Sequence, residues 1–524
     1  MIRKILTRHS SITEATVILA VASLVSRFFG LIRDRTLASH FGAGTVLDSY
    51  FAAFKIPDLV FNLLILGALS SVFIPIFTEY LRKNQKEAWV FTNSLLNIGV
   101  AFLSLILLIL FVFAPTLAHL VAPGFDPERL TLVIGLMRIM LLSPLIFGLS
   151  NLAGGILNSY RNFFVYSLAP ILYNLGIIAG VIFIVPLVGP LGLAYGVVLG
   201  ALLHLLIQIP SVFLSGYRYR PSFNLRHPAL KRLGVLMLPR TLGLATGQLS
   251  LLANTIIAST LAMGSIAVLN LADNIYSLPV SLFGISLAVA AFPTLSDQAA
   301  RGSWTDFRDT LRRLFRQVLF LIIPTMLFYW IFRAQIIRLI LGAGLFGWED
   351  TRFTVSVLAF LTFGMVAHAT IPLLARAFYA RKDTATPFLI GLVALAINIL
   401  AALILISFLK VVGLALAISL AALSNLAGLI LILQRRIHWL KWGEASILIA
   451  KLILSSLAAA ASGYLMLRIA DLIVDTHTVL GLFLQTAFSG LVFLFIYLTA
   501  TQLFRVPEVN LIRRPLSFIK TFRR

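Results

Sequence analysis

Apolar segments long enough to cross a lipid bilayer follow one another along almost all of this 524-residue chain. One membrane-spanning helix needs roughly 20 predominantly apolar residues. We expect about fourteen such spans, over residues 12–33, 47–78, 88–114, 129–152, 164–187, 190–214, 238–262, 266–295, 316–341, 353–379, 385–408, 411–433, 446–469 and 478–504. Hydrophobic residues make up 60% of the chain and charged residues 12%, which excludes a soluble globular protein. The sequence therefore predicts an all-α polytopic membrane protein.

Basic residues lie mainly between the apolar segments. The chain holds 42 Lys and Arg against 19 Asp and Glu, a net charge of +23. Every second connection is basic, including residues 216–237 and both ends, and basic connections lie on the cytoplasmic side. We expect a multi-pass protein with both termini in the cytoplasm and no cleavable signal peptide. Because no basic stripe interleaves with exposed aromatic residues, the charge does not indicate a nucleic-acid partner.

The second half of the chain repeats short motifs of the first half, with a period of about 220 residues. In both copies an Ala-Ser pair precedes a glycine and two prolines: Ala38, Gly44, Pro57 and Pro75, then Ala258, Gly264, Pro279 and Pro293. Each copy holds six spans, so the two copies enter the membrane with the same polarity, and parallel repeats place binding sites between them. We predict an N-terminal lobe (1–215), a basic connector (216–237), a C-terminal lobe (238–434), two additional helices (435–504) and a basic tail (505–524).

Charged and amide residues lie inside spans that are otherwise apolar. A charge at bilayer depth costs about 2.5–3.5 kcal/mol on insertion scales, so such side chains seldom face lipid. They are Arg27, Arg33 and Asp34 in the first span, Asp48, Lys55, Asp58 and Asn62 in the second, Asn254 in the seventh, and Asn270, Asp273 and Asn274 in the eighth. Polar faces at equivalent positions of two repeats predict one water-filled cavity; the alternative is a set of ion pairs between helices. By contrast, the spacing of Gly192, Gly196 and Gly200 is typical of close helix packing.

Several kinds of chemistry have no support in the sequence. The chain has no cysteine, and its eight histidines show no metal-ligand spacing. It contains no phosphate-binding glycine loop and no zinc-protease motif. We therefore expect no catalytic residues and no cofactor, although a membrane-embedded transferase remains an alternative.

Five motifs together resemble the MurJ (MviN) lipid II flippases of the MOP exporter superfamily. They are Ser26–Asp34, Phe41–Gly44, Asp48–Pro57, Ala122–Phe125 and Phe378–Asp383. The resemblance implies fourteen helices, two six-helix lobes in a V, and an apolar groove at the last two helices for a polyprenyl tail. It also implies that Arg27, Arg33 and Asp48 are cavity residues, with both arginines on the substrate pyrophosphate. The implied activity is translocation of an undecaprenyl-pyrophosphate-linked peptidoglycan precursor in the bacterial cytoplasmic membrane; a flippase for another lipid-linked oligosaccharide, a drug exporter of the superfamily, or a polyprenyl-phosphate transferase are the alternatives.

The sequence departs from the family pattern at several cavity positions. Where the family usually has an Arg-Arg pair followed by Ala-Glu-Gly, this chain has Phe61, Asn62 and the triplet 65–67, and Asn274 stands where an arginine is usual. This makes the cavity less cationic; Lys55 is the nearest substitute, and Arg138 the next. Asn398 matches a position near the sodium site of some members, but Ala402 offers no carboxylate. We expect coupling to the membrane potential or to a monovalent ion, with membrane lipids and cell-wall synthesis proteins as further partners.

Overall fold

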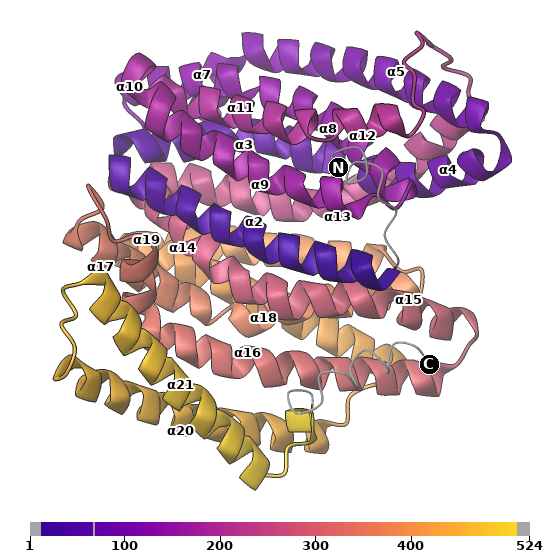
Figure 1. Ribbon diagram of the computed structural model, residues 1–524. Coiled ribbons are helices and arrows are strands. Elements are labelled where there is room, and N and C mark those ends of the chain that lie inside the picture. Colours follow the sequence, from indigo (N-terminus) through magenta and orange to yellow (C-terminus); the bar gives the residue numbers. More distant parts are fainter. Residues whose placement is uncertain (1–11, 67–68, 511–524) are drawn as a thin grey trace. The chain divides into compact units, whose positions relative to one another are not determined.

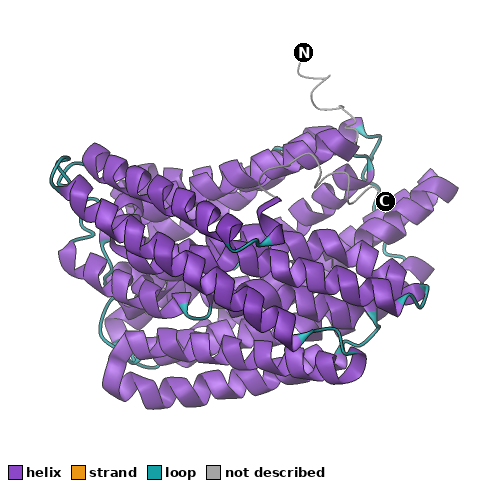
Figure 2. Cartoon of the chain, turned by 90° about the horizontal axis from the view of Figure 1, so that it is seen from below, coloured by secondary structure: helices purple, strands orange, loops and turns teal. Residues whose placement is uncertain are grey.

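In the computed structural model, which describes residues 12–66 and 69–510, every regular element is a helix (Figures 1 and 2). The all-α prediction is therefore confirmed for these residues. Residues 1–11, 67–68 and 511–524 lie outside the described part; they include Arg3, Lys4 and Arg8, most of the predicted basic tail, and two residues of the predicted second span.

The chain divides into two compact units. The first unit comprises residues 1–267 and 343–347. Its helices are α2 (Ile12–Phe41), α3 (Thr45–Val60), α4 (Leu69–Lys83), α5 (Gln85–Val112), α6 (Ala114–Val121), α7 (Pro127–Met140), α8 (Leu142–Ser159), α9 (Phe163–Ala179), α10 (Val185–Val188), α11 (Gly192–Leu206), α12 (Ile209–Leu214) and α13 (Pro228–Ser259). Two π-helical segments, Phe61–Leu66 and Gly180–Ile184, continue α3 and α9.

The second unit comprises residues 268–342 and 348–524. It contains most of α14 (Ser265–Pro279) and the helices α15 (Ser286–Ala300), α16 (Trp304–Ile340), α17 (Trp348–Thr362), α18 (Met365–Ala380), α19 (Ala385–Ile437), α20 (Trp442–Asp471) and α21 (Val479–Leu503). The units follow packing, whereas the predicted lobes follow the sequence repeat, and the lobe boundaries stay a prediction.

In residues 12–66 and 69–510, helices long and apolar enough to span a membrane cover eleven of the fourteen predicted spans; the first, second and seventh spans are not among them. Among the described residues, eight helices, or nine with α17 and α18 as one span bent by 45°, are long and apolar enough to cross a membrane. The segments 163–214 and 385–437 each cover two predicted spans, and α19 has non-helical backbone at Lys410, between the ranges predicted for spans eleven and twelve. The chain is thus a multi-pass membrane protein, and the count of fourteen is consistent with this but stays a prediction.

The backbone confirms the internal repeat. Eight of the eleven residues with positive φ in the described part of the chain form pairs separated by 221 or 222 positions: Gly42 and Gly264, Arg161 and Lys382, Gly189 and Lys410, and Gly216 and His438. Gly264 therefore pairs with Gly42 and not, as predicted, with Gly44, whose φ is −134°. The two prolines that the repeat aligns, Pro57 and Pro279, each precede a six-residue π-helical segment, Phe61–Leu66 and Val280–Ile285. A π-helical segment widens a helix locally and is found frequently at functional sites.

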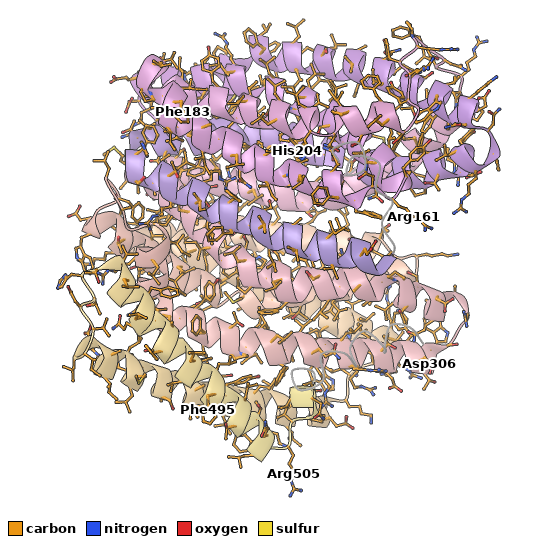
Figure 3. All side chains as sticks on the ribbon, in the orientation of Figure 1. Arg161, Phe183, His204, Asp306, Phe495 and Arg505 are labelled. Atoms are coloured by element: carbon orange, nitrogen blue, oxygen red, sulfur yellow. The ribbon has the colours of Figure 1, made fainter. Side chains whose placement is uncertain are left out.

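Large apolar side chains cover the outside of both units. Phe183 in the first and Phe495 in the second, both labelled in Figure 3, are each 68% exposed. Hydrocarbon solvates such side chains, so this exposure is what a bilayer requires and a soluble protein avoids.

The predicted glycine ladder is a close helix contact. In the first unit α11 packs against α9 (Figure 1), and a Cβ atom at Gly200 would lie 2.5 Å from the carbonyl oxygen of Tyr173. A Cβ atom at Gly192 would lie 2.5 Å from the backbone nitrogen of Val185. These glycines therefore let two backbones meet, as small residues do between membrane helices.

We expect the substitution Gly200→Ala to destabilise the protein by about 1–3 kcal/mol, because the new methyl group overlaps the α9 backbone. Gly247→Ala in α13 is the control, since a Cβ atom there meets no atom within 4 Å. At that position alanine should be neutral or slightly stabilising, as it is the better helix former. The midpoint of thermal unfolding in detergent measures both, and equal midpoints for the two variants would contradict this account.

Candidate functional site

Arg33 is held by two partners inside the first unit. Its Nε and Nη2 atoms donate to Oδ1 of Asp34 at 3.0 and 2.8 Å, and Nη1 donates to Oδ1 of Asn174 in α9 at 3.2 Å. The side chain of Asp34 is 3% exposed and that of Arg33 23% exposed. The carboxylate therefore neutralises this cation locally, and α9 fixes the direction of its guanidinium group.

Asn174 ties the same pair to the helix backbone. Its Nδ2 atom donates to the carbonyl oxygen of Ser26 at 3.3 Å and to that of Pro170 at 3.1 Å. The motif Ser26–Asp34 is thus anchored to α9 at two places. Arg27, in the same motif, is half-buried and makes no hydrogen bond or ion pair within the described part of the chain.

A cavity of about 360 Å³ opens beside Arg33, entirely within the first unit. Its polar lining residues are Arg33, Asp58, Ser143, Tyr173 and His204, and its remaining lining consists of Phe54, Pro57, Phe61, Phe147 and Pro170. Asn62 lies at the π-helical segment and donates to the carbonyl oxygen of Asp58 at 2.9 Å. Two predicted residues, Arg33 and Asp58, therefore share one polar cavity, and Phe61 lies in its wall.

Sequence reasoning missed Tyr173 and His204. Nδ1 of His204, which is labelled in Figure 3, forms a hydrogen bond of 2.6 Å with Oγ of Ser150, and the tautomer of the histidine decides which of the two atoms donates. Nε2 of Gln208 donates to the same hydroxyl at 2.7 Å. A signal was present, because His204 and Gln208 are one helical turn apart in a span that is otherwise apolar. In residues 12–66 and 69–510 no group of three His, Cys, Asp or Glu side chains comes together to hold a metal.

Asp48 is a helix cap. It is 2% exposed, and its Oδ2 and Oδ1 atoms accept hydrogen bonds from the backbone nitrogens of Gly264 at 2.6 Å and Ala267 at 2.8 Å. These nitrogens lie at the start of α14, where a carboxylate satisfies open donors and the positive end of the helix dipole. Both carboxylate oxygens of Asp48 are thus hydrogen-bonded to backbone nitrogens. A role of Asp48 in substrate binding stays a prediction.

The other predicted residues lie at several places. Lys55 is half-buried in α3, and Asn254 is buried in α13, which contacts α3. Arg138 of α7 lies over the ring of Phe111 in α5, with 5.0 Å from its guanidinium carbon to the ring centre. Its Nε atom donates to the carbonyl oxygen of Phe111 at 3.4 Å. Arg138 is therefore engaged with α5 and does not line the 360 Å³ cavity beside Arg33.

In the second unit, Asn270, Asp273 and Asn274 lie on consecutive turns of α14 and are half-buried. The carbonyl oxygen of Asn274 accepts a hydrogen bond from Ser277 at 2.9 Å. Asn398 is 1% exposed in α19, with Ala402 buried one turn later. Their predicted roles, including sodium binding at Asn398, stay predictions.

The motif Phe378–Asp383 ends α18 and begins α19. Oδ1 of Asp383 accepts from the backbone nitrogen of Thr386 at 2.9 Å, Oδ2 accepts from its hydroxyl at 2.6 Å, and Arg436 forms an ion pair with the same carboxylate. Burial alone would raise the pKa of Asp383, but these hydrogen bonds outweigh it and hold the pKa below its ordinary value. This motif therefore builds a helix start that joins both ends of α19.

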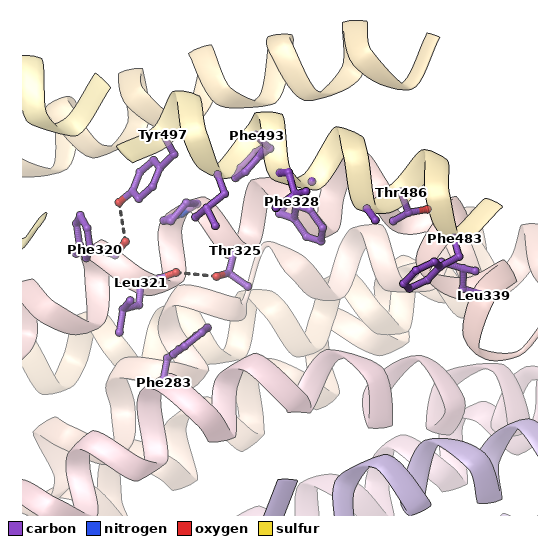
Figure 4. A pocket seen from close by; sticks show the side chains of 15 residues that line it. Phe283, Phe320, Leu321, Thr325, Phe328, Leu339, Phe483, Thr486, Phe493 and Tyr497 are labelled. Carbon is purple, nitrogen blue, oxygen red and sulfur yellow. Dashed lines mark hydrogen bonds between the residues drawn. The ribbon is translucent and has the colours of Figure 1, made fainter. Parts of the chain in front are cut away.

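An apolar cavity of about 690 Å³ lies in the second unit between α16 and α21 (Figure 4). Phenylalanines from both helices line it, among them Phe320, Phe328, Phe483 and Phe493, and the π-helical segment adds Phe283. The hydroxyl of Tyr497 donates to the carbonyl oxygen of Phe320 at 2.6 Å, which fixes one end of α21 against α16. The cavity can accept a long hydrocarbon chain.

Comparison with known proteins assigns the family. The family model described as "Lipid II flippase MurJ" matches residues 37–488. The chain belongs to the MurJ family. A probable lipid II flippase MurJ of Rhizobium tropici is 29% identical over 97% of both chains, and the lipid II flippase MurJ of Burkholderia cenocepacia is 30% identical over 79% of this chain and 82% of its own.

Solved structures agree with this assignment. A lipid II flippase MurJ in an inward closed conformation shares 25% of its sequence with this chain, with a TM-score of 0.76 over 93% of this chain and 98% of its own. An inward-facing MATE family transporter of the MOP superfamily reaches a TM-score of 0.66 at 16% identity, over 80% of this chain and 98% of its own. The second likeness concerns the fold alone, which is that of the MOP superfamily.

The capping role of Asp48 can be tested by substitution. We expect Asp48→Ala to lower stability by about 2–4 kcal/mol, because it leaves two buried backbone donors without an acceptor. Asp48→Asn should cost less, since one acceptor oxygen remains. Asp126→Ala removes an exposed cap at the start of α7 and should cost about 1 kcal/mol.

The measurement is again the midpoint of thermal unfolding, with transport measured in parallel. If Asp48→Ala unfolds at the wild-type temperature and yet abolishes transport, the capping account is wrong and Asp48 acts on the substrate.

Proposed function

We propose that this chain is a transporter that moves lipid II, the undecaprenyl-pyrophosphate-linked peptidoglycan precursor, from the inner to the outer leaflet of the bacterial cytoplasmic membrane. The observation that carries the proposal is the match of the MurJ family model to residues 37–488. Transport proceeds by alternating access between the two repeats, and no bond of the substrate is made or broken. The chain is therefore a transporter and not an enzyme.

The arginines of α2 provide the chemistry that a pyrophosphate needs. A guanidinium group presents a planar fork of donors to phosphate oxygens, and a site of low dielectric strengthens each such contact. Arg33 is offset by Asp34, whereas Arg27 has no ion-pair partner among the described residues. We infer that Arg27 supplies the net positive charge that attracts the headgroup. Arg33, whose guanidinium group is held by Asn174, orients the pyrophosphate.

The polyprenyl tail needs a separate, apolar environment. We infer that it lies along the 690 Å³ cavity between α16 and α21 in the second unit, whose lining is almost wholly hydrocarbon. Burial of apolar surface there stabilises the complex by about 25 cal/mol for each square ångström removed from water. Only the headgroup then has to cross the membrane through a polar route.

A flippase for a different lipid-linked oligosaccharide is the second candidate, favoured by Phe61, Asn62 and Asn274 at positions where the family usually has arginines. Fewer cations suit a less anionic headgroup. Transport is driven in either case by the membrane potential or a monovalent ion, and the protein acts next to cell-wall synthesis enzymes.

Complementation tests the function and the role of Arg27 together. In a strain depleted of its own lipid II flippase, the wild-type chain should restore growth and Arg27→Ala should not. Arg27→Lys should restore growth only in part, because the ammonium group lacks the bidentate fork. Arg218→Ala, an exposed arginine of the connector, is the matched control and should complement fully.

Protein abundance in the membrane is measured for each variant. Loss of the Arg27→Ala protein from the membrane would assign Arg27 to folding. Failure of the abundant wild-type chain to complement would favour the other oligosaccharide lipid as substrate.

We also propose that both termini and residues 216–237 face the cytoplasm. Because the chain has no cysteine, single cysteines at Asn224 and Gly347 can be labelled with a membrane-impermeant maleimide in intact cells. Both positions are exposed. Gly347→Cys should be labelled and Asn224→Cys should react only after permeabilisation; the opposite pattern would reverse the orientation.

A further inference from the structure

The first unit holds another cavity, of about 560 Å³, which shares no lining residue with the polar cavity at Arg33. Residues from the first π-helical segment, α5, α8, the connector and the start of α13 line it. Its wall is apolar, with Leu96, Leu103 and Leu152 among the lining residues, and Gly99 faces open space, because a Cβ atom there would meet no atom within 4 Å.

Two cations lie at the edge of this apolar cavity. Arg226 and Lys231 are among its lining residues, both are exposed, and no acidic residue lines it. Neither side chain makes a hydrogen bond or ion pair within residues 12–66 and 69–510. By contrast, the neighbouring Arg232 is paired, since its Nη1 atom donates to Oε2 of Glu79 at 2.7 Å.

The connector is fastened to α5 and forms a fixed wall. The hydroxyls of Tyr217 and Tyr219 donate to Oδ1 of Asn93 at 2.7 Å and of Asn97 at 2.8 Å. Asn97 also donates to the carbonyl oxygen of Ser222 at 2.9 Å. These contacts hold residues 217–222 in place just before Arg226.

A helix begins at the same edge. α13 starts at Pro228, between the two cations, and runs for 32 residues. Its first backbone donors are already bonded within the protein: the nitrogen of Ala229 donates to Nδ1 of His227 at 3.1 Å, and that of Leu230 to the carbonyl oxygen of His227 at 3.0 Å. The basic side chains of Arg226 and Lys231 are therefore the groups at this edge that can bind an anion, while the rest of the cavity lining is apolar.

We propose that this cavity binds one acyl chain of an anionic phospholipid, whose phosphate lies at Arg226 and Lys231. The combination of an apolar slot and a cationic edge matches the two ends of such a lipid, and basic pockets between membrane helices recognise anionic headgroups. The cavity, at about 560 Å³, is large enough for one fatty-acyl chain. The proposal does not depend on the transported substrate.

Native mass spectrometry of the purified full-length chain in detergent tests the proposal, with dioleoyl phosphatidylglycerol and dioleoyl phosphatidylcholine as the probes. The wild type should bind phosphatidylglycerol more tightly than phosphatidylcholine. The double substitution Arg226→Gln with Lys231→Gln should weaken phosphatidylglycerol binding about tenfold, as expected when two basic groups near an anionic lipid are lost.

Two controls distinguish lipid binding in this cavity from attraction of the lipid by the net positive charge of the protein. Arg218→Gln with Arg220→Gln removes the same charge from exposed connector positions that do not line the cavity, and phosphatidylglycerol affinity should then stay at the wild-type value. Gly99→Phe fills the cavity and leaves every charge in place, so it should abolish binding of the site-specific lipid. Gly99→Leu serves as the second cavity-filling variant if the phenylalanine variant unfolds at a lower temperature.

Three results would overturn the proposal. Equal weakening by the two charge pairs would mean that the lipid is attracted by net charge only. Unchanged binding in both cavity-filling variants would mean that no acyl chain enters the cavity. Displacement of phosphatidylglycerol by undecaprenyl phosphate in the wild type would assign the cavity to polyprenyl lipids.

Discussion

The hydrocarbon core of a bilayer offers no hydrogen-bond partner to a peptide group, so a chain that crosses it must satisfy its own backbone. Helices do this within one segment, which is why all regular structure in residues 12–66 and 69–510 is helical. Even the irregular places obey the same rule. The π-helical segments after Pro57 and Pro279 keep backbone bonds while changing the helix width, and the open donors at the start of α14 are met by Asp48.

The same constraint governs charge. An ion inside the membrane must find a partner or a polar cavity, and the first unit provides both. Arg33 is matched by Asp34 one residue away and oriented by Asn174, 141 positions further along the chain. Arg27 has no partner of this kind among the described residues. In the transport mechanism that we propose, the unmatched Arg27 attracts the anionic headgroup and the fixed guanidinium group of Arg33 orients it.

Much of the fold could be predicted from the sequence, because the length and apolar composition of a segment identify a membrane helix without knowledge of its neighbours. The repeat could be predicted for a similar reason, since the prolines and glycines that set local backbone recur in order. Partners across the fold could not be predicted. Nothing in the local sequence of Asp48 indicates that Gly264 and Ala267 take both of its oxygens, because these partners lie 216 and 219 positions away in the chain. His204 and Tyr173 join the cavity only because α9 and α11 pack closely at glycines.

The paired turns carry different amounts of backbone strain in the two halves of the chain. Gly189 has φ 69° and ψ −156°, and Lys410, its counterpart, has φ 52° and ψ −133°. This region of backbone space is essentially restricted to glycine, and a lysine there costs about 1–3 kcal/mol. The same bend is thus built by a glycine in one half and by a lysine in the other, so the two halves carry unequal backbone strain at equivalent points. Packing around the bend, and not the local preference of the residue, therefore holds the connection at Lys410.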